Sequence, residues 1–104
     1  MKLFERREDE WVMIGTGLAV GPSDIDAATQ TVRLIANGRR LGGPDDGEPF
    51  KQVIEATVGQ TVELGPNVLM SVLAIVGPAV RLGVNAPRHL PVAAREDVER
   101  RGGF

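Results

Sequence analysis

The N-terminal segment places an aromatic ring close to two guanidinium groups. It reads Leu3-Phe4-Glu5-Arg6-Arg7, and in an extended strand the side chains of Phe4 and Arg6 lie on one face. A guanidinium beside an aromatic ring can contact a phosphate and stack on an unpaired base. Arg7 lies on the opposite face or at the strand end, where it can still contact a phosphate.

Three acids, Glu8-Asp9-Glu10, directly follow these arginines. Their charge raises the free energy of bringing a phosphate close to the segment. In an alternative interpretation, Arg6 and Arg7 only solvate an edge strand and pair with Glu8 or Glu10. The net charge of −2 and a pI near 5.3 also argue against a general affinity for polyanions. Binding of RNA would therefore need a local basic patch.

Few other residues have the types or spacing that catalysis or metal binding requires. The chain has no cysteine, which excludes disulfides and thiolate metal sites and fits a reducing compartment. His89 stands without a framework of metal ligands. Gly15-Thr16-Gly17 lacks the helix of a phosphate-binding loop, and the acids lack calcium-loop spacing. The sequence therefore predicts no enzyme, no metal site and no cofactor.

The composition is typical of one small globular unit. Of 104 residues, 42% are hydrophobic and 25% charged, but only 4% are aromatic, so Val, Ile, Leu and Ala must form the core. Trp11 is expected in the core or as its partial cover, with base stacking as the alternative. The charged N-terminus is unlike a signal peptide, and the longest apolar run is too short to span a bilayer. These features predict a cytoplasmic protein without membrane contact.

Short strands divided by Gly and Pro are the main structural pattern. Val80, Leu82 and Val84 alternate as in a strand with one buried face, and Asn85-Ala86-Pro87 then predicts a turn. An earlier copy of this pattern occurs at Thr31–Gly38. Strand and turn signals alternate in this way along the whole chain, which is typical of small all-β folds.

The chain also aligns with itself. Residues 3–5, 12, 14, 15 and 18 match residues 50 positions later, and residues 32–34 and 37 match residues 48 positions later. The first copy is thus two residues longer, and Gly21–Asp26 is the expected place for the extra turn. Chance alignment of short strands is one alternative, and a single domain with a long insertion is another.

The string Val72–Arg88, followed by Val92 and Arg95-Glu96-Asp97-Val98, resembles the carbon storage regulator (CsrA/RsmA) family of small bacterial RNA-binding proteins. Residues 3–7 and Met13-Ile14-Gly15 resemble the opening of the same family. The resemblance is specific over residues 57–98 and fair over residues 1–15. An insertion does not explain why residues 51–65 also resemble the family's first two strands, so a tandem duplication is favoured.

The resemblance implies a fold, because the family forms homodimers whose chains exchange their first and last strands. We expect an all-β fold with a short C-terminal helix, in which two repeats form an intrachain pseudo-dimer of interleaved antiparallel sheets. Residues 1–50 are the degenerate repeat with its Gly/Pro/Asp linker, and residues 51–104 are the repeat with the helix, together one compact unit. The helix is expected over residues 93–101, ending at Gly102-Gly103. The chain should be a monomer.

The resemblance also implies a site, formed by the first strand of one copy and the end of the last strand of the other. The expected RNA-binding residues are Phe4, Arg6, Arg7, Val92 and Arg95. In the second copy, Ala56-Thr57 replaces the two arginines, so that site is expected to be inactive. One residue more than in the family separates Pro87 from Arg95. Without a β-bulge, it turns Arg95 away from the face of Val92.

The function that the resemblance implies is post-transcriptional regulation. The expected partner is an mRNA or small RNA with GGA motifs, bound through one intact site so that translation initiation is blocked or message decay is altered. A protein antagonist is a further expected partner. The alternative is a divergent relative that has lost RNA binding and acts through a protein partner, and a third hypothesis is a structural β domain.

Overall fold

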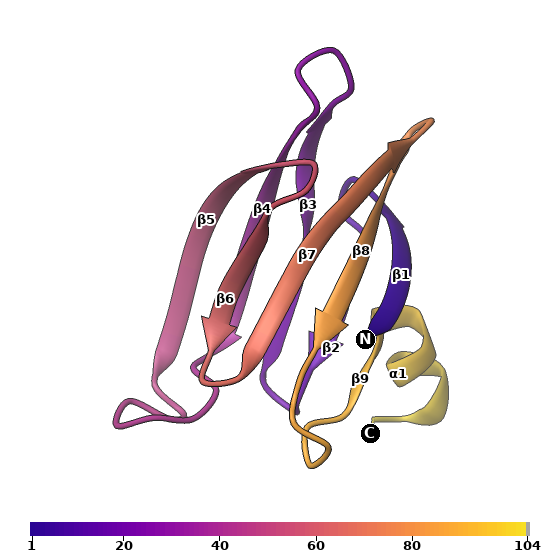
Figure 1. Cartoon of the computed structure of the whole chain (residues 1–104). Coiled ribbons are helices and arrows are strands. Elements are labelled where there is room, and N and C mark those ends of the chain that lie inside the picture. Colours follow the sequence, from indigo (N-terminus) through magenta and orange to yellow (C-terminus); the bar gives the residue numbers. More distant parts are fainter. Residues whose placement is uncertain (104) are drawn as a thin grey trace.

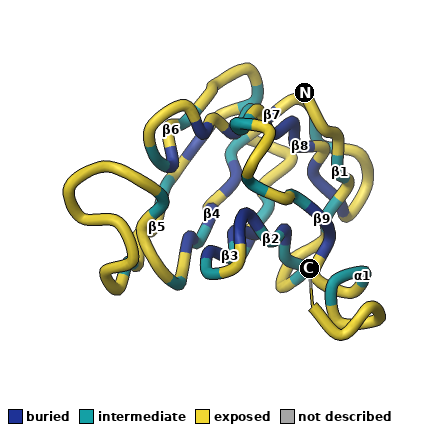
Figure 2. Tube along the Cα trace, turned by 90° about the horizontal axis from the view of Figure 1, so that it is seen from below, coloured by how far each residue is buried: buried dark blue, intermediate teal, exposed yellow. Residues whose placement is uncertain are grey.

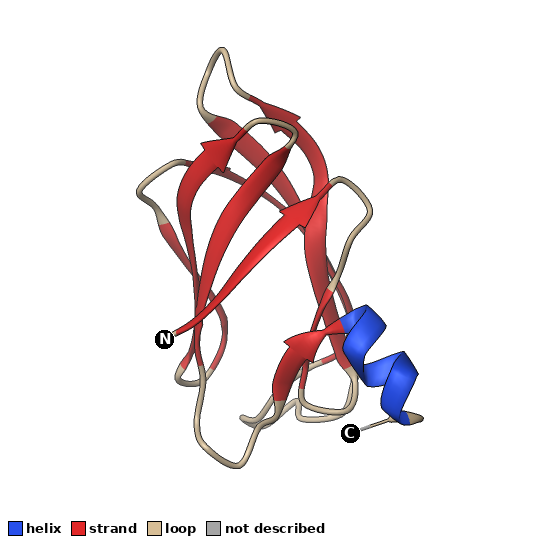
Figure 3. Cartoon of the chain, turned by 90° about the vertical axis from the view of Figure 1, so that its right-hand side faces the viewer, coloured by secondary structure: helices blue, strands red, loops and turns tan. Residues whose placement is uncertain are grey.

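Two antiparallel sheets face each other in the computed structural model, which describes residues 1–103 (Figure 1). Phe104, the last residue of the second predicted repeat, lies outside the described residues. The strand order is β1-β8-β7-β6 in the first sheet and β5-β4-β3-β2-β9 in the second. The strands are β1 (Lys2–Arg7), β2 (Val12–Ile14), β3 (Leu18–Asp26), β4 (Thr31–Arg39), β5 (Pro49–Thr57), β6 (Thr61–Gly65), β7 (Val68–Val76), β8 (Ala79–Asn85) and β9 (Val92–Ala94). A single short helix in the described chain, α1 (Arg95–Arg101), follows β9 directly (Figure 3).

Alternating aliphatic side chains fill the space between the sheets. Strand β8 buries Val80, Leu82 and Val84, and strand β4 buries Val32 and Leu34 in the same way. These five residues are at most 2% exposed, and the buried stretches gather between the two layers (Figure 2). The predicted all-β fold with a short C-terminal helix is confirmed.

Each sheet contains strands from both halves of the chain. Strand β1 joins β6, β7 and β8, whereas β5 and β9 join β2, β3 and β4. Lys2 lies opposite Val84 in the β1–β8 pair, and Gln52 lies opposite Ala36 in the β4–β5 pair. Gln52 follows Lys2 by 50 positions and Val84 follows Ala36 by 48, the same offsets by which the sequence aligns with itself. The two pairings are therefore equivalent in register.

The inner strand pairs repeat a local irregularity as well. The register shifts between Pro22 and Asp24 in the β3–β4 pair, and between Val72 and Ala74 in the β7–β8 pair. The two extra residues of the first half lie beyond this point, in the turn 27–30 that joins β3 to β4.

The predicted position of these extra residues, Gly21–Asp26, is wrong, since those residues belong to β3. Gly21 has a different role from that of a turn residue. A Cβ added there would lie 2.3 Å from the Glu10 carbonyl oxygen, so glycine permits a close backbone approach.

The linker and the helix deviate little from the prediction. Residues 40–48 form a loop, as their Gly, Pro and Asp content predicts. Ala93 and Ala94 belong to β9 rather than to the helix, because pairing with β2 buries them and overrides their helix propensity. The helix ends at Gly102, which adopts the left-handed conformation with φ 77°. Within residues 1–103, no helix has the length and apolar character that crossing a membrane requires.

Candidate nucleic-acid interface

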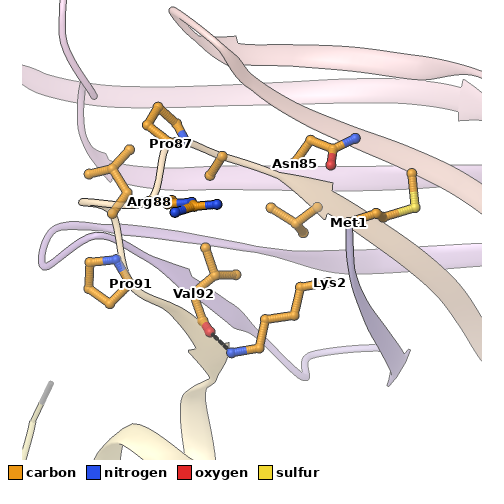
Figure 4. A pocket seen from close by; sticks show the side chains of 10 residues that line it. Met1, Lys2, Asn85, Pro87, Arg88, Pro91 and Val92 are labelled. Carbon is orange, nitrogen blue, oxygen red and sulfur yellow. Dashed lines mark hydrogen bonds between the residues drawn. The ribbon is translucent and has the colours of Figure 1, made fainter.

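Two contacts join β1 to the last strand and the helix. The Lys2 ammonium group donates a hydrogen bond to the Val92 carbonyl oxygen (Figure 4). At the other end of β1, the Arg6 guanidinium donates to Glu96 Oε1 at 2.6 Å. The structure therefore brings predicted site residues from the two ends of the sequence to one border of the sandwich.

Arg6 is largely enclosed, with 12% of its side chain exposed. Its guanidinium also lies 3.4 Å from the Trp11 carbonyl oxygen, to which the Arg95 backbone N–H donates at 3.0 Å. Arg6 and the backbone of Arg95 thus meet at one oxygen atom. Half-buried Trp11 supplies that atom from the residue before β2.

The ion pair fixes the charge state of both partners. The hydrogen bond that Arg6 donates to Glu96 raises the pKa of Arg6 above its ordinary value, against the opposing effect of burial. The same bond lowers the pKa of Glu96. Both groups are therefore charged at neutral pH, and a phosphate that approaches Arg6 has to compete with the Glu96 carboxylate.

The other predicted residues of β1 lie on different faces. Phe4 shares the inward face with Arg6 and packs against the hydrophobic core, so its ring is only partly accessible. Arg7 is exposed on the opposite face, and its backbone N–H donates to Glu10 Oε1 at 2.7 Å. The inward and outward positions follow from strand alternation, as predicted.

A turn precedes β9 in the segment between Pro87 and Arg95. The Leu90 N–H donates to the Pro87 carbonyl oxygen at 3.0 Å, and β9 then pairs with β2 in a regular register from Val92 onward. Arg95 begins the helix, where its guanidinium donates to Glu99 Oε1 at 2.9 Å. Val92 therefore contributes its carbonyl oxygen to the contact with β1, and the Arg95 side chain pairs on its own helix.

The acids after β1 have structural roles in the turn. Glu8 accepts a hydrogen bond from the Ile25 N–H at 3.3 Å, and Glu10 accepts one from Arg7. Asp9 adopts a left-handed conformation with φ 64°. Arg6 pairs with Glu96 rather than with Glu8 or Glu10, although the nearby charge of Glu10 adds to the upward shift of the Arg6 pKa.

A cavity of about 470 Å³ opens between the start of β1, the end of β8 and the loop before β9 (Figure 4). It is lined by Met1, Lys2, residues 84–88 and residues 90–92. Sequence reasoning missed the two cations here, Lys2 and Arg88. Arg88 belongs to the string that carries the family resemblance, but nothing local indicated that it lies near Lys2. We call this cavity, together with Arg6 and Arg95 further along the same border of the sandwich, the β1–β9 groove.

The equivalent border of the sandwich lacks these groups. Strand β5 carries Gln52, Ile54 and Ala56 at the positions that correspond to Lys2, Phe4 and Arg6. Its neighbouring edge strand β6 has no strand on its outer side in the described residues. The cations Lys2 and Arg6 of β1 therefore have no counterpart at the equivalent positions of β5, although Arg40, from the loop after β4, lies at this border.

Comparisons with known proteins find several translational regulators named CsrA. The chain is 39% identical over 44 residues to the translational regulator CsrA of Exiguobacterium sp. (strain AT1b), a match that covers 42% of this chain and 59% of that protein. It is 34% identical over 44 residues to CsrA of Bacillus velezensis and of Thermotoga petrophila, covering 42% of this chain and 60% and 53% of those proteins.

The chain thus spans less than two thirds of the length of the curated relatives it matches. No protein-family model and no solved structure matches it. Over this segment of 44 residues, the chain is CsrA-like.

Proposed function

We propose that this chain is an RNA-binding translational regulator that recognises GGA-containing leader RNA through the β1–β9 groove. The observation that carries the proposal is the junction of β1 with β9, where Lys2 bonds the Val92 carbonyl beside Arg88. The similarity to proteins named as translational regulators supports it.

The chemistry of the groove fits single-stranded RNA. Lys2 and Arg88 can neutralise phosphates, and Phe4 offers part of a ring for stacking. Strand β1 lies at the edge of its sheet, so its outer side has no partner strand in the described residues. The backbone groups of Leu3 there can bond the edges of unpaired bases, whereas the Arg7 N–H already bonds Glu10. Occupation of a leader sequence near the start of translation would block initiation sterically or alter message decay.

We further infer that residues 1–50 and 51–104 derive from a tandem duplication and form one pseudo-dimer with a single intact site. The equivalent registers of the β1–β8 and β4–β5 pairs support this origin. Ala56 in place of an arginine, and the unpaired side of β6, support the loss of the second site.

The test is a salt titration of binding to a GGA hairpin and to a hairpin with the GGA scrambled. We expect tighter binding of the GGA hairpin, one hairpin per chain, and an affinity that falls linearly with the logarithm of salt concentration. Arg6→Ala and Arg95→Ala should each weaken binding by about 1–3 kcal/mol. Ala56→Arg should change little. Two hairpins per chain would contradict the single site.

A second candidate function is action through a protein partner after loss of RNA binding. The specific observation in its favour is that two predicted RNA-binding arginines are paired within the chain, Arg6 with Glu96 and Arg95 with Glu99. If the hairpin titration detects no GGA binding at low salt, even after Glu8 and Glu10 are replaced by Gln, this second function replaces the first.

A further inference from the structure

Strand β6 occupies in the first sheet the position that β2 occupies in the second. Val62 lies opposite Met70 as Val12 lies opposite Val20, with both residues 50 positions further along the chain. Yet β2 pairs with β9 on its outer side, whereas β6 ends its sheet (Figure 1). Of these two equivalent strands, β2 has a partner strand on its outer side and β6 has none in the described residues.

The outer side of β6 carries main-chain groups without a partner strand. The Val72 N–H donates to the Gln60 carbonyl at 2.9 Å, which directs Gln60 toward β7. Because backbone groups alternate along a strand, Thr61 and Glu63 direct their N–H and C=O groups to the opposite, outer side. On the equivalent strand, the carbonyl oxygen of Trp11, the counterpart of Thr61, points outward in this way and accepts a hydrogen bond from the Arg95 N–H. Among the described residues, no backbone bond takes that role for Thr61 or Glu63.

The apolar residues at this edge are incompletely covered. Val12 is 0% exposed beneath the β2–β9 pair, whereas its counterpart Val62 is only half-buried. Ile54 and Phe50 of β5 are also half-buried. A cavity of about 300 Å³ connects Phe50 on β5 with Glu63 on β6. Free backbone groups next to uncovered apolar side chains are the combination that binds an added strand.

The surroundings of this cavity are mainly acidic. Glu63 and Asp45 line it, and Asp46 and Glu48 lie in the same loop. The cation that lines the cavity, Arg40, stacks on Phe50 at 4.6 Å from the ring centroid. A second copy of this chain would bring two such acidic loops together, so a basic partner is favoured over self-association.

We propose that this β6 edge, the outer side of Thr61–Gly65 with its cavity, binds a short antiparallel strand of a partner protein. The partner strand carries small or β-branched apolar residues at alternate positions, facing Val62, and a Lys or Arg flank that meets Glu63 and Asp45. Strand β9 pairs with β2, the equivalent of β6, over only three residues, so a partner strand of that length is sufficient. The register shift between Glu63 and Gly65 limits the pairing to a short strand.

This proposal does not rest on RNA binding, because β1 and β6 are opposite edges of the same sheet. A suitable probe is a capped peptide with the sequence of residues 91–95 and an added lysine at each end. Titrated into the isotopically labelled full chain, it should shift the amide resonances of Thr61 and Glu63. It should also slow amide hydrogen exchange at Glu63 at least about tenfold at saturation.

Glu63→Pro removes the backbone N–H that would bind the added strand. It should leave the existing sheet intact, since proline is tolerated on edge strands. It should lower the peptide affinity at least about tenfold, a loss of ~1.4 kcal/mol. The matched variant Glu63→Gln keeps the N–H and should lose less. Neither change should alter binding of the GGA hairpin. If the proline variant does not fold, the hydrogen exchange of Glu63 in the unaltered chain, with and without peptide, still tests the proposal.

Three results would overturn the proposal. One is an unchanged exchange rate at Glu63 in the presence of saturating peptide. Another is a set of peptide-induced shifts confined to the β1–β9 groove. The last is self-association of the chain through the β6 edge without peptide, which would make a second copy the occupant.

Discussion

The Arg6 guanidinium lies 2.6 Å from Glu96 Oε1, across 90 residues of sequence. Lys2 bonds the Val92 carbonyl across the same separation. The two contacts clamp β1 against β9 and α1, and so hold the two borders of the β1–β9 groove at a fixed distance. In each contact, the cation (Lys2 or Arg6) is bound within the chain, so an RNA phosphate has to compete with that partner for it.

Glu96→Gln should reduce the stability of the chain at neutral pH and remove part of its acid sensitivity. The pKa of Glu96 is lowered in the folded chain, so the pair stabilises the fold above the unfolded-state value. This contribution is lost as the pH falls through the lowered pKa, below about pH 5. With nearly half of the Glu96 side chain exposed, it should amount to about 1 kcal/mol or less. Urea denaturation of both proteins over this pH range measures it, and parallel stability curves would contradict the prediction.

Lys2→Ala and Arg88→Ala should weaken RNA binding to similar extents for GGA and scrambled hairpins. Both side chains line the groove, and each is expected to neutralise a phosphate. The salt slope of binding should therefore fall by about 1 for each change. Lys51→Ala is the matched control, because Lys51 lies on β5, an edge of the other sheet. An equal effect of Lys51→Ala would indicate that binding is unspecific.

Replacing both Glu8 and Glu10 by Gln should tighten RNA binding and steepen its salt dependence. Gln keeps the side-chain oxygen that accepts from Ile25 or Arg7, so the turn should persist. If each carboxylate lies about 8 Å from an RNA phosphate in water, removing both charges lowers the free energy of binding by ~1 kcal/mol, or roughly fivefold in affinity at low salt. Fluorescence titration at several salt concentrations measures the change. Unaltered affinity at low salt would show that these acids do not oppose the approach of phosphate.

Gly21→Ala should destabilise the chain by about 1–3 kcal/mol and disturb the groove. The added Cβ would lie 2.3 Å from the Glu10 carbonyl oxygen and 3.3 Å from the Trp11 Cα. The Trp11 carbonyl that bonds Arg95 would have to move. Gly17→Ala is the milder control, since its added Cβ would lie 3.3 Å from the Arg39 Cβ, a contact that a small local shift relieves. Equal denaturation midpoints of the two variants would contradict the argument.

The chain should sediment as a monomer with a mass near 11.1 kDa. Strands of both halves complete the two sheets within one chain, so the core closes without a second copy. Sedimentation equilibrium at low concentration measures the mass. A value near twice that of the chain would favour a single domain with an insertion.

Local patterns were sufficient to predict the strands and the kind of fold. The alternation of Val80, Leu82 and Val84 is a property of neighbouring residues, and a buried face requires it whichever strand lies beside it. The C-terminal helix was expected from the family resemblance, and it begins two residues later than predicted. The pair of segments that forms the groove was expected from the family resemblance, not from any local pattern.

The sequence by itself thus determined the all-β character, the repeat offsets and the residue types of β1. Only the tertiary structure decided that Arg6 pairs with Glu96, that Lys2 and Arg88 line one cavity, and that the extra residues of the first half follow Asp26. The physical reason is that these features depend on contacts between segments far apart in the chain. Periodicity specifies which face of a strand is buried, but it carries no information on which distant side chain meets it there.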